Sequence, residues 1–184
     1  DQVMISNLPN WIYLAPTTLE EEKAMIKWAI RQRCHPVAIK MPANVPDSDE
    51  QNIITDYTNY SEIKYSIIPG KDVAILALGD FYQLGKEVAT KLDATLVNPL
   101  SANILDEQTL NQLAASHEVI VTLEDNSLDG GFGQKVASYL GKTKVKILNY
   151  GQNRVYTDQT PLSEIYRQNH LTADQIVADV QQIL

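Results

Sequence analysis

One glycine-rich stretch holds the residues whose types and spacing are best suited to chemistry. The sequence LEDNSLDGGFG at 123–133 places Glu124 and Asp125 at the end of an apolar run, and Gly130 and Gly131 just before a helical pattern. In open α/β sheets, ligands bind at the carboxyl ends of the strands. Two carboxylates there could exchange protons or face a cation, while the glycines and a helix N-terminus could admit an anion. These four residues are therefore candidates for a substrate-side or interface site.

A purely structural role explains the same stretch. Glycines permit a tight turn, and Asp129 is placed to cap the helix that follows. Neither a Walker A motif nor a complete GxGxxG is present. Glu124 and Asp125 are adjacent, so along an extended backbone their side chains point to opposite faces and do not pair. The pattern favours a structural turn over a phosphate site within this chain.

The remaining reactive side chains form no recognisable catalytic or metal-binding cluster. None of the histidines is spaced with Cys, Asp or Glu as metal ligands are; they are His35, His117 and His170. Cys34 adjoins His35, but a nucleophile pair needs contact in space that adjacency does not supply. Gly79-Asp80 follows an apolar run, a common place for ligands in such folds. The sequence therefore predicts no catalytic, cofactor-binding or metal-ligating residue.

Composition narrows the classes of partner. The 184 residues are 44% hydrophobic and 21% charged, which is typical of a folded domain, and the formal net charge is −8. Such a chain repels nucleic-acid phosphates and anionic membrane surfaces, and it contains no apolar run long enough to span a bilayer. The single cysteine forms no internal disulfide and no signal-peptide pattern is visible, which favours the cytoplasm.

The first forty residues predict a strand–helix–strand piece. Residues 12–15 and 36–39 are short apolar runs typical of buried strands, and a helix is expected to begin after Thr18, which has capping-box spacing with Glu21. The chain starts at Asp1 and enters the first apolar run within a dozen residues, so we expect a piece cut from a longer protein. The polar stretch 43–61 is typical of a connector.

The rest alternates strands and helices. Apolar runs at 73–78, 94–97, 119–123 and 145–148 predict strands, and the segments 82–92, 106–115 and 132–140 predict helices between them. Strand–helix–strand units of this length require parallel pairing, so we expect a doubly wound, mostly parallel α/β sheet. Residues 63–68 are expected to add an antiparallel edge as the fifth strand. Thr172, with capping-box spacing to Gln175, begins a final helix whose apolar face is expected to dock on the sheet.

Several stretches together resemble one family. The run ending in Glu124-Asp125-Asn126, the GGFG at 130–133, the AASHE at 114–118 and the ATLVNPL at 94–100 closely resemble the C-terminal domain of 1-deoxy-D-xylulose-5-phosphate synthases. Residues 8–16 and 36–39 resemble the end of that family's pyrimidine-binding domain. The resemblance covers essentially the whole chain, and the motifs are shared in part with transketolases and pyruvate dehydrogenases.

The resemblance implies a domain division and a parent enzyme. Residues 1–44 would be the end of the pyrimidine-binding domain, 45–62 a linker and 63–184 the transketolase C-terminal domain. The parent would be a dimeric, thiamine-diphosphate-dependent transferase of two-carbon units. In the family, the cofactor and Mg²⁺ are held by a GDG…N motif and the activating glutamate lies in the middle domain, and neither segment is present here. The fragment alone is therefore expected to bind no cofactor, to be inactive, and to act as a scaffold and dimerisation module beside the missing N-terminal domains.

One departure from the family pattern concerns the substrate. In the synthases the last strand of the middle domain ends in RYPRG, whose second arginine binds the substrate phosphate. The matching stretch here is KMPAN at 40–44, so Ala43 replaces that arginine and Lys40 keeps a positive charge at the place of the first. Alanine cannot supply the bidentate, charge-assisted contact that arginine makes to phosphate. The parent's substrate therefore stays open among ketoses and keto acids.

Two other functions stay open at this point. The chain could be a free-standing regulatory module that holds a small ligand near Gly79-Asp80 and residues 124–133. It could also be the C-terminal domain of a keto-acid dehydrogenase E1 β-subunit, which shares the fold and would require a separate α-subunit.

Overall fold

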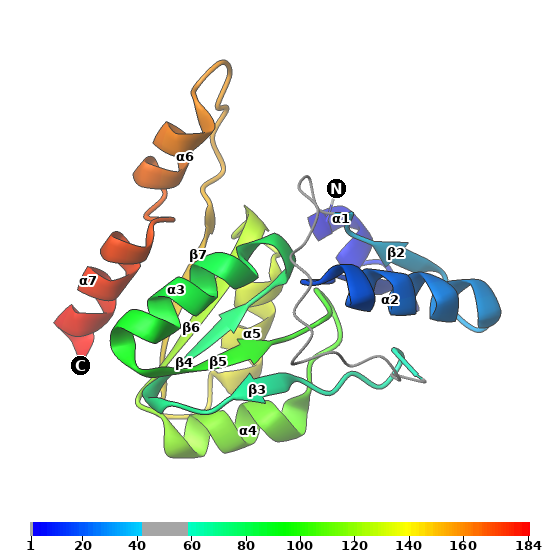
Figure 1. Ribbon diagram of the computed structural model, residues 1–184, viewed down its shortest axis with the longest axis horizontal. Coiled ribbons are helices and arrows are strands. Elements are labelled where there is room, and N and C mark those ends of the chain that lie inside the picture. Colours follow the sequence, from blue (N-terminus) through cyan, green and yellow to red (C-terminus); the bar gives the residue numbers. More distant parts are fainter. Residues whose placement is uncertain (1, 42–58) are drawn as a thin grey trace.

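A five-stranded sheet forms the centre of the larger unit. The computed structural model describes residues 2–41 and 59–184. The strands are β3 (Ser66–Ile68), β4 (Lys71–Ala77), β5 (Ala94–Asn98), β6 (Val119–Ser127) and β7 (Lys146–Gln152), in the spatial order β3-β5-β4-β6-β7 (Figure 1). β3 pairs antiparallel with β5, and the other neighbours pair parallel. The predicted mostly parallel five-stranded α/β sheet with an antiparallel edge is confirmed.

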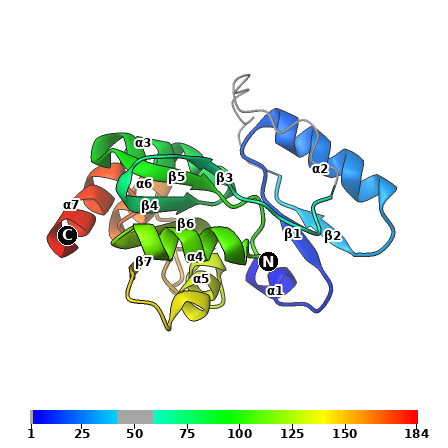
Figure 2. The same cartoon turned by 90° about the horizontal axis from the view of Figure 1, so that it is seen from below.

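Helices cover both faces of the sheet. Figure 2 shows α3 (Tyr82–Leu92) and α7 (Ala173–Ile183) on one face, and α4 (Glu107–Ser116) and α5 (Phe132–Leu140) on the other. Successive strand residues point to opposite faces, so Ala74 and Leu76 of β4 join the core under α4 and α5, while Ile75 joins the core under α3 and α7. Burial of each large apolar side chain contributes about 1.5–3 kcal/mol. This double covering explains why the central strands are nearly continuous apolar runs.

The N-terminal residues form a second, smaller unit. It contains α1 (Gln2–Ser6), β1 (Ile12–Leu14), α2 (Leu19–Arg31) and β2 (Val37–Ile39), and lies beside the sheet at the blue and cyan end of Figure 1. β1 and β2 pair parallel, with Ile12 opposite Val37, as the predicted strand–helix–strand piece requires. A two-stranded sheet is marginal by itself. The stability of the small unit therefore depends on contacts with the rest of the chain.

The segment that follows β5 supplies a partner for β1. The Ala15 N–H donates to the Leu100 carbonyl at 2.8 Å, and the Ala102 N–H donates to the Tyr13 carbonyl at 2.9 Å. The Asn103 side chain adds a bond to the Trp11 carbonyl at 2.8 Å. The same hydrophobic core also runs through both units. The two units are thus joined by backbone hydrogen bonds and by shared packing.

A buried carboxylate strengthens the same junction. Thr18 caps α2 as predicted, accepting a bond from the Glu21 N–H at 3.2 Å. Glu21, only 4% exposed, accepts from the Thr17 N–H at 2.8 Å and from the Asn98 amide at 3.0 Å. Burial raises the Glu21 pKa, although these hydrogen bonds oppose the shift. A hydrogen bond from the Thr18 backbone also lowers the Glu21 pKa, as the expected capping box requires, and the carboxylate in addition accepts from an amide of the other unit.

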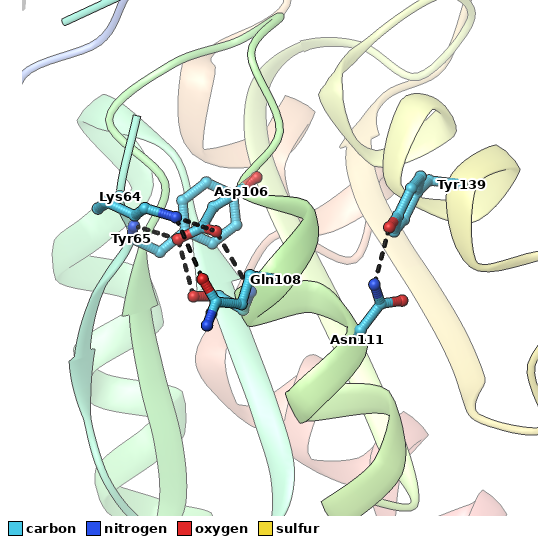
Figure 3. Close-up of polar contacts among 7 residues, drawn as sticks. Lys64, Tyr65, Asp106, Gln108, Asn111 and Tyr139 are labelled. Carbon is cyan, nitrogen blue, oxygen red and sulfur yellow. Dashed lines mark hydrogen bonds and ion pairs between the residues drawn. The ribbon is translucent and has the colours of Figure 1, made fainter. Parts of the chain in front are cut away.

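Asp106 organises the start of α4 (Figure 3). Its carboxylate accepts from the Thr109 N–H at 3.2 Å and the Thr109 hydroxyl at 2.8 Å, and from the Tyr65 N–H at 3.1 Å. Burial alone would raise the Asp106 pKa, but these bonds and the charge of Lys64 lower it. This cap therefore also fixes the segment that leads into β3. Figure 3 shows a second link of this kind, from the Asn111 amide of α4 to the Tyr139 hydroxyl of α5, at 2.9 Å.

Several expectations on local structure need correction. The helix α6 (Leu162–Gln168) was not predicted, β6 continues to Ser127 instead of ending at residue 123, and β3 is shorter than residues 63–68. The Thr172 side chain makes no bond to the backbone of α7, and its hydroxyl donates to the Gln175 side chain at 2.7 Å. Most of the expected connector, namely residues 43–58 of 43–61, lies outside the described residues. Within the described ranges, no helix is long and apolar enough to cross a membrane.

Candidate functional site

Three of the sequence candidates meet at the carboxyl ends of the strands. Lys40 follows β2, Asp80 lies in the short helix η1 (Gly79–Phe81) after β4, and Asp125 belongs to β6. The Lys40 ammonium lies 3.0 Å from the Asp80 carboxylate and 2.8 Å from the Asp125 carboxylate. Parallel strands bring Asp80 and Asp125 to one edge of the sheet, and the docking of the N-terminal unit brings Lys40 to them. Lys40 thus bridges the two units.

The Lys40 ammonium is paired with the Asp80 and Asp125 carboxylates. Burial of the Lys40 ammonium by itself lowers its pKa, but hydrogen bonds and charge attraction from Asp125 and Asp80 outweigh burial and raise it. Lys40 is therefore charged at neutral pH and faces two carboxylates, which leaves the cluster with a net negative charge. A lysine held in this way is not a free cation for phosphate. Ala43, the other position that departs from the family's phosphate motif, lies outside the described residues.

Glu124 caps a helix in the described structure. Its side chain is fully buried, and its two carboxylate oxygens accept from the Phe132 N–H at 2.9 Å and the Gly133 N–H at 2.8 Å. Burial raises the Glu124 pKa, and the two backbone bonds work against that rise. The expected cap, Asp129, is wrong: α5 begins after Gly131, and Glu124 satisfies the first backbone N–H groups. Adjacent Asp125 is exposed, in agreement with the expectation that the two side chains point to opposite faces.

The two glycines make room for these contacts. A methyl group at Gly131 would lie 2.5 Å from both Glu124 carboxylate oxygens. Gly130 adopts a φ of 75°, in the left-handed region that favours glycine, and its carbonyl accepts from the Asn7 amide at 3.2 Å and the Lys135 ammonium at 2.7 Å. A methyl group there would also press on Val3 of α1 at 2.8 Å. Within the described residues, the glycine turn is thus an interface with the N-terminal unit.

The histidines lie apart from this cluster. His117 contacts the Thr95 hydroxyl at 2.8 Å through Nε2 and the Ser116 hydroxyl at 2.9 Å through Nδ1, which is a hydrogen-bonded structural setting. His35 lies 3.3 Å from the Asn10 carbonyl through Nδ1. His170 pairs with Asp179 at 2.9 Å. Among residues 2–41 and 59–184, no group of three or more His, Cys, Asp or Glu side chains is arranged to hold a metal ion.

The fold and this junction define a class of protein. Residues 64–176 match the model of the transketolase C-terminal domain, and the chain belongs to that family. Its described structure is that of the C-terminal portion of a synthase- or transketolase-like protein.

The relatives and neighbouring structures agree on this class. A 1-deoxy-D-xylulose-5-phosphate synthase from Pseudoalteromonas translucida is 37% identical over 78% of this chain and 23% of its own length. The synthase from Clostridium acetobutylicum is 31% identical over 80% of this chain and 25% of its own. The chain thus spans about a quarter of these curated relatives. A structure described as a split-gene transketolase, an inactive beta4 tetramer, has a TM-score of 0.82 and 26% identity over 98% of this chain and 59% of that chain. A transketolase mutant from Pichia stipitis shares the fold, with a TM-score of 0.69 and 17% identity over 96% of this chain and 25% of that chain.

Proposed function

We propose that the chain is the C-terminal part of a thiamine-diphosphate-dependent transferase that moves two-carbon units from a ketose or keto acid. The family match over residues 64–176 supports this proposal, together with identities above 30% to synthases over about four-fifths of the chain. The domain division at 1–44, 45–62 and 63–184 belongs to the same proposal, as does a cytoplasmic location. The cofactor would carry the chemistry, and protein domains outside this chain would hold it.

Within that enzyme, the chain acts as a scaffold and an assembly module. The observation that carries this proposal is that the polar groups at the carboxyl edge are already used for structure. Lys40 is neutralised by Asp80 and Asp125, and Glu124 caps α5. The similar split-gene transketolase chain is described as an inactive beta4 tetramer. By analogy, this chain is expected to self-associate and to be inactive without the domains that hold the cofactor.

The described residues do not fit the cofactor's diphosphate, and no three or more of their His, Cys, Asp and Glu side chains are arranged to hold its Mg²⁺. Diphosphate binding calls for free cationic or backbone donors, and magnesium calls for free oxygen ligands. At the carboxyl edge Lys40 already faces two carboxylates, which leaves that cluster with a net negative charge, and Lys135 already donates to the Gly130 carbonyl. Electrostatic repulsion would therefore oppose a diphosphate at this edge.

Calorimetry tests the scaffold proposal. Thiamine diphosphate with Mg²⁺ is titrated into the chain, with inorganic pyrophosphate and Mg²⁺ as a control for unspecific phosphate binding. We expect no saturable heat in either titration, and a multimeric mass by light scattering. Saturable binding of thiamine diphosphate but not of pyrophosphate would show that this chain holds the cofactor, and would overturn the scaffold role. A strictly monomeric chain at micromolar concentration would overturn the assembly role.

An E1 β-type subunit of a keto-acid dehydrogenase remains the alternative with the same fold. The two parents differ in the partner that they require. Co-purification from the native source with a separate α-subunit would favour the dehydrogenase, whereas a single longer polypeptide that contains this sequence would favour a synthase.

A further inference from the structure

A cleft of about 460 Å³ lies between β7 and α7. Its lining includes Leu148 and Tyr150 of β7, His170 of the turn between α6 and α7, and Asp179, Gln182 and Ile183 of α7. Helices α6 and α7 lie to one side of the sheet, in orange and red in Figure 1. The volume is within the range of small-molecule sites, about 300–1,000 Å³. None of these residues belongs to the cluster around Lys40.

One side of the cleft is a network of three titratable side chains. The Tyr150 hydroxyl donates to Asp179 Oδ2 at 3.1 Å, and His170 Nδ1 lies 2.9 Å from the same oxygen. Both contacts use Oδ2, so Asp179 Oδ1 and His170 Nε2 have no hydrogen-bond partner among the described residues. The network thus holds one acceptor and one imidazole nitrogen in fixed positions and leaves both available.

His170 has a left-handed backbone conformation and places its imidazole beside Asp179. His170 follows the end of α6 with a φ of 57°, and the next N–H, of Leu171, donates back to the Tyr166 carbonyl at 2.8 Å. Glycine is the usual residue in this left-handed position after a helix. Histidine adopts the same conformation at a higher energetic cost than glycine. In this conformation the His170 imidazole contacts the Asp179 carboxylate.

The edge of the sheet adds backbone donors and acceptors. β7 is an outer strand, and its Lys146 N–H donates inward to the Glu118 carbonyl at 3.0 Å. Because alternate residues of a parallel edge strand direct their backbone groups outward, the groups of Asn149 and Gly151 face away from β6. Both residues line the cleft. The cleft thus offers hydrogen-bonding groups on the strand side as well as on the helix side.

The charge of the lining selects the kind of ligand. It contains no lysine or arginine, so a phosphate would lack the cationic partner that such groups need. Lys146 lies close by but donates to the Ile183 carbonyl. A hydroxyl group donates and accepts at once, which matches the mixture of carboxylate, imidazole, amide and backbone groups. Leu148 and Ile183 give an apolar wall for carbon atoms. We infer that this cleft binds a neutral polyhydroxylated molecule, a sugar or a sugar alcohol.

Ligand-observed saturation-transfer NMR on the full chain tests this inference. The probes are D-glucose, D-ribose and sorbitol, with D-glucose 6-phosphate and D-ribose 5-phosphate as charged counterparts. We expect saturable binding of at least one neutral probe and weaker binding of its phosphorylated form. Adjacent glutamines supply a matched pair of variants, because Gln182 lines the cleft and Gln181 does not. The loss of one hydrogen-bonding side chain in Gln182→Ala should weaken binding by about tenfold, and Gln181→Ala should leave it unchanged.

His170→Gly separates binding from stability. Glycine relieves the left-handed backbone, so the variant should keep its melting temperature while it loses sugar binding. The inference is overturned if no neutral probe binds, or if the phosphorylated probes bind more tightly than their parents. Equal binding by Gln182→Ala and Gln181→Ala would also overturn it, because the sugar would then lie elsewhere. This outcome is independent of the thiamine diphosphate titration.

Discussion

Replacement of Gly131 by alanine should strongly destabilise the protein although its backbone permits any residue. The new methyl group would lie 2.5 Å from both Glu124 carboxylate oxygens and 2.6 Å from the Ser127 carbonyl. Either the carboxylate leaves the Phe132 and Gly133 N–H groups or the turn shifts. Loss of a helix cap costs about 0.5–2 kcal/mol. Overpacking adds about 1–3 kcal/mol. The lower entropy of an unfolded chain with alanine returns about 0.4–1 kcal/mol.

The expected net loss is about 1–4 kcal/mol, a large share of a typical folding free energy of about 5–15 kcal/mol. Urea unfolding at a fixed protein concentration measures it. With a slope of about 2 kcal/mol per molar, the midpoint should fall by about 0.5–2 M. Gly141→Ala is the matched control, since its nearest neighbours would lie 3.4 and 3.5 Å from the added carbon at an ordinary φ of −61°. An unchanged midpoint for Gly131→Ala would refute the role given to Glu124.

Three further predictions concern the junction and its charges. The folded-state pKa of Lys40 is raised, so the stabilisation by its charge is complete below the usual lysine pKa and is lost as pH rises through the raised value. The urea unfolding midpoint should therefore fall over that alkaline range, and Lys40→Met should remove this pH dependence. Asp106→Ala should cost about 1–2 kcal/mol in urea unfolding, whereas exposed Glu107→Ala should cost far less. Asn98→Ala leaves a buried carboxylate short of a partner and should cost about 1–3 kcal/mol; a change below the error of the midpoint would show that the junction network is dispensable.

The strands and most helices could be predicted from the sequence because their signals are local. β4 and β6 are apolar runs that a doubly covered sheet requires, and Asp106 carries the signature of a helix cap within three residues. The helix α6 also has a local signal, Pro161 before Leu162, but its seven residues are too few for a clear apolar period.

The site could be predicted only in part, because its contacts join distant positions. Parallel topology places Asp80 and Asp125 at one edge, but the approach of Lys40 depends on how the two units dock, which no local pattern reports. Glu124 caps a helix that begins eight residues later, beyond the spacing at which caps are read from sequence. Its only signal is Gly131, the residue that leaves space for the carboxylate. By local spacing Asp129 is the better candidate for the cap. Glu124 forms the cap instead, because β6 directs its side chain toward the start of α5.

The pairing of β1 with the segment after β5 sets an order of events during synthesis. The last residue of β2, Ile39, leaves the ribosome 64 positions before Asn103, whose segment completes the small sheet. At about 5–20 residues per second, the small unit waits roughly 3–13 s for its missing partner. During that interval Ile12, Tyr13 and Leu14 lack the cover that they have in the finished fold. The earlier part of the chain is therefore exposed to aggregation or chaperones until the later part has been made.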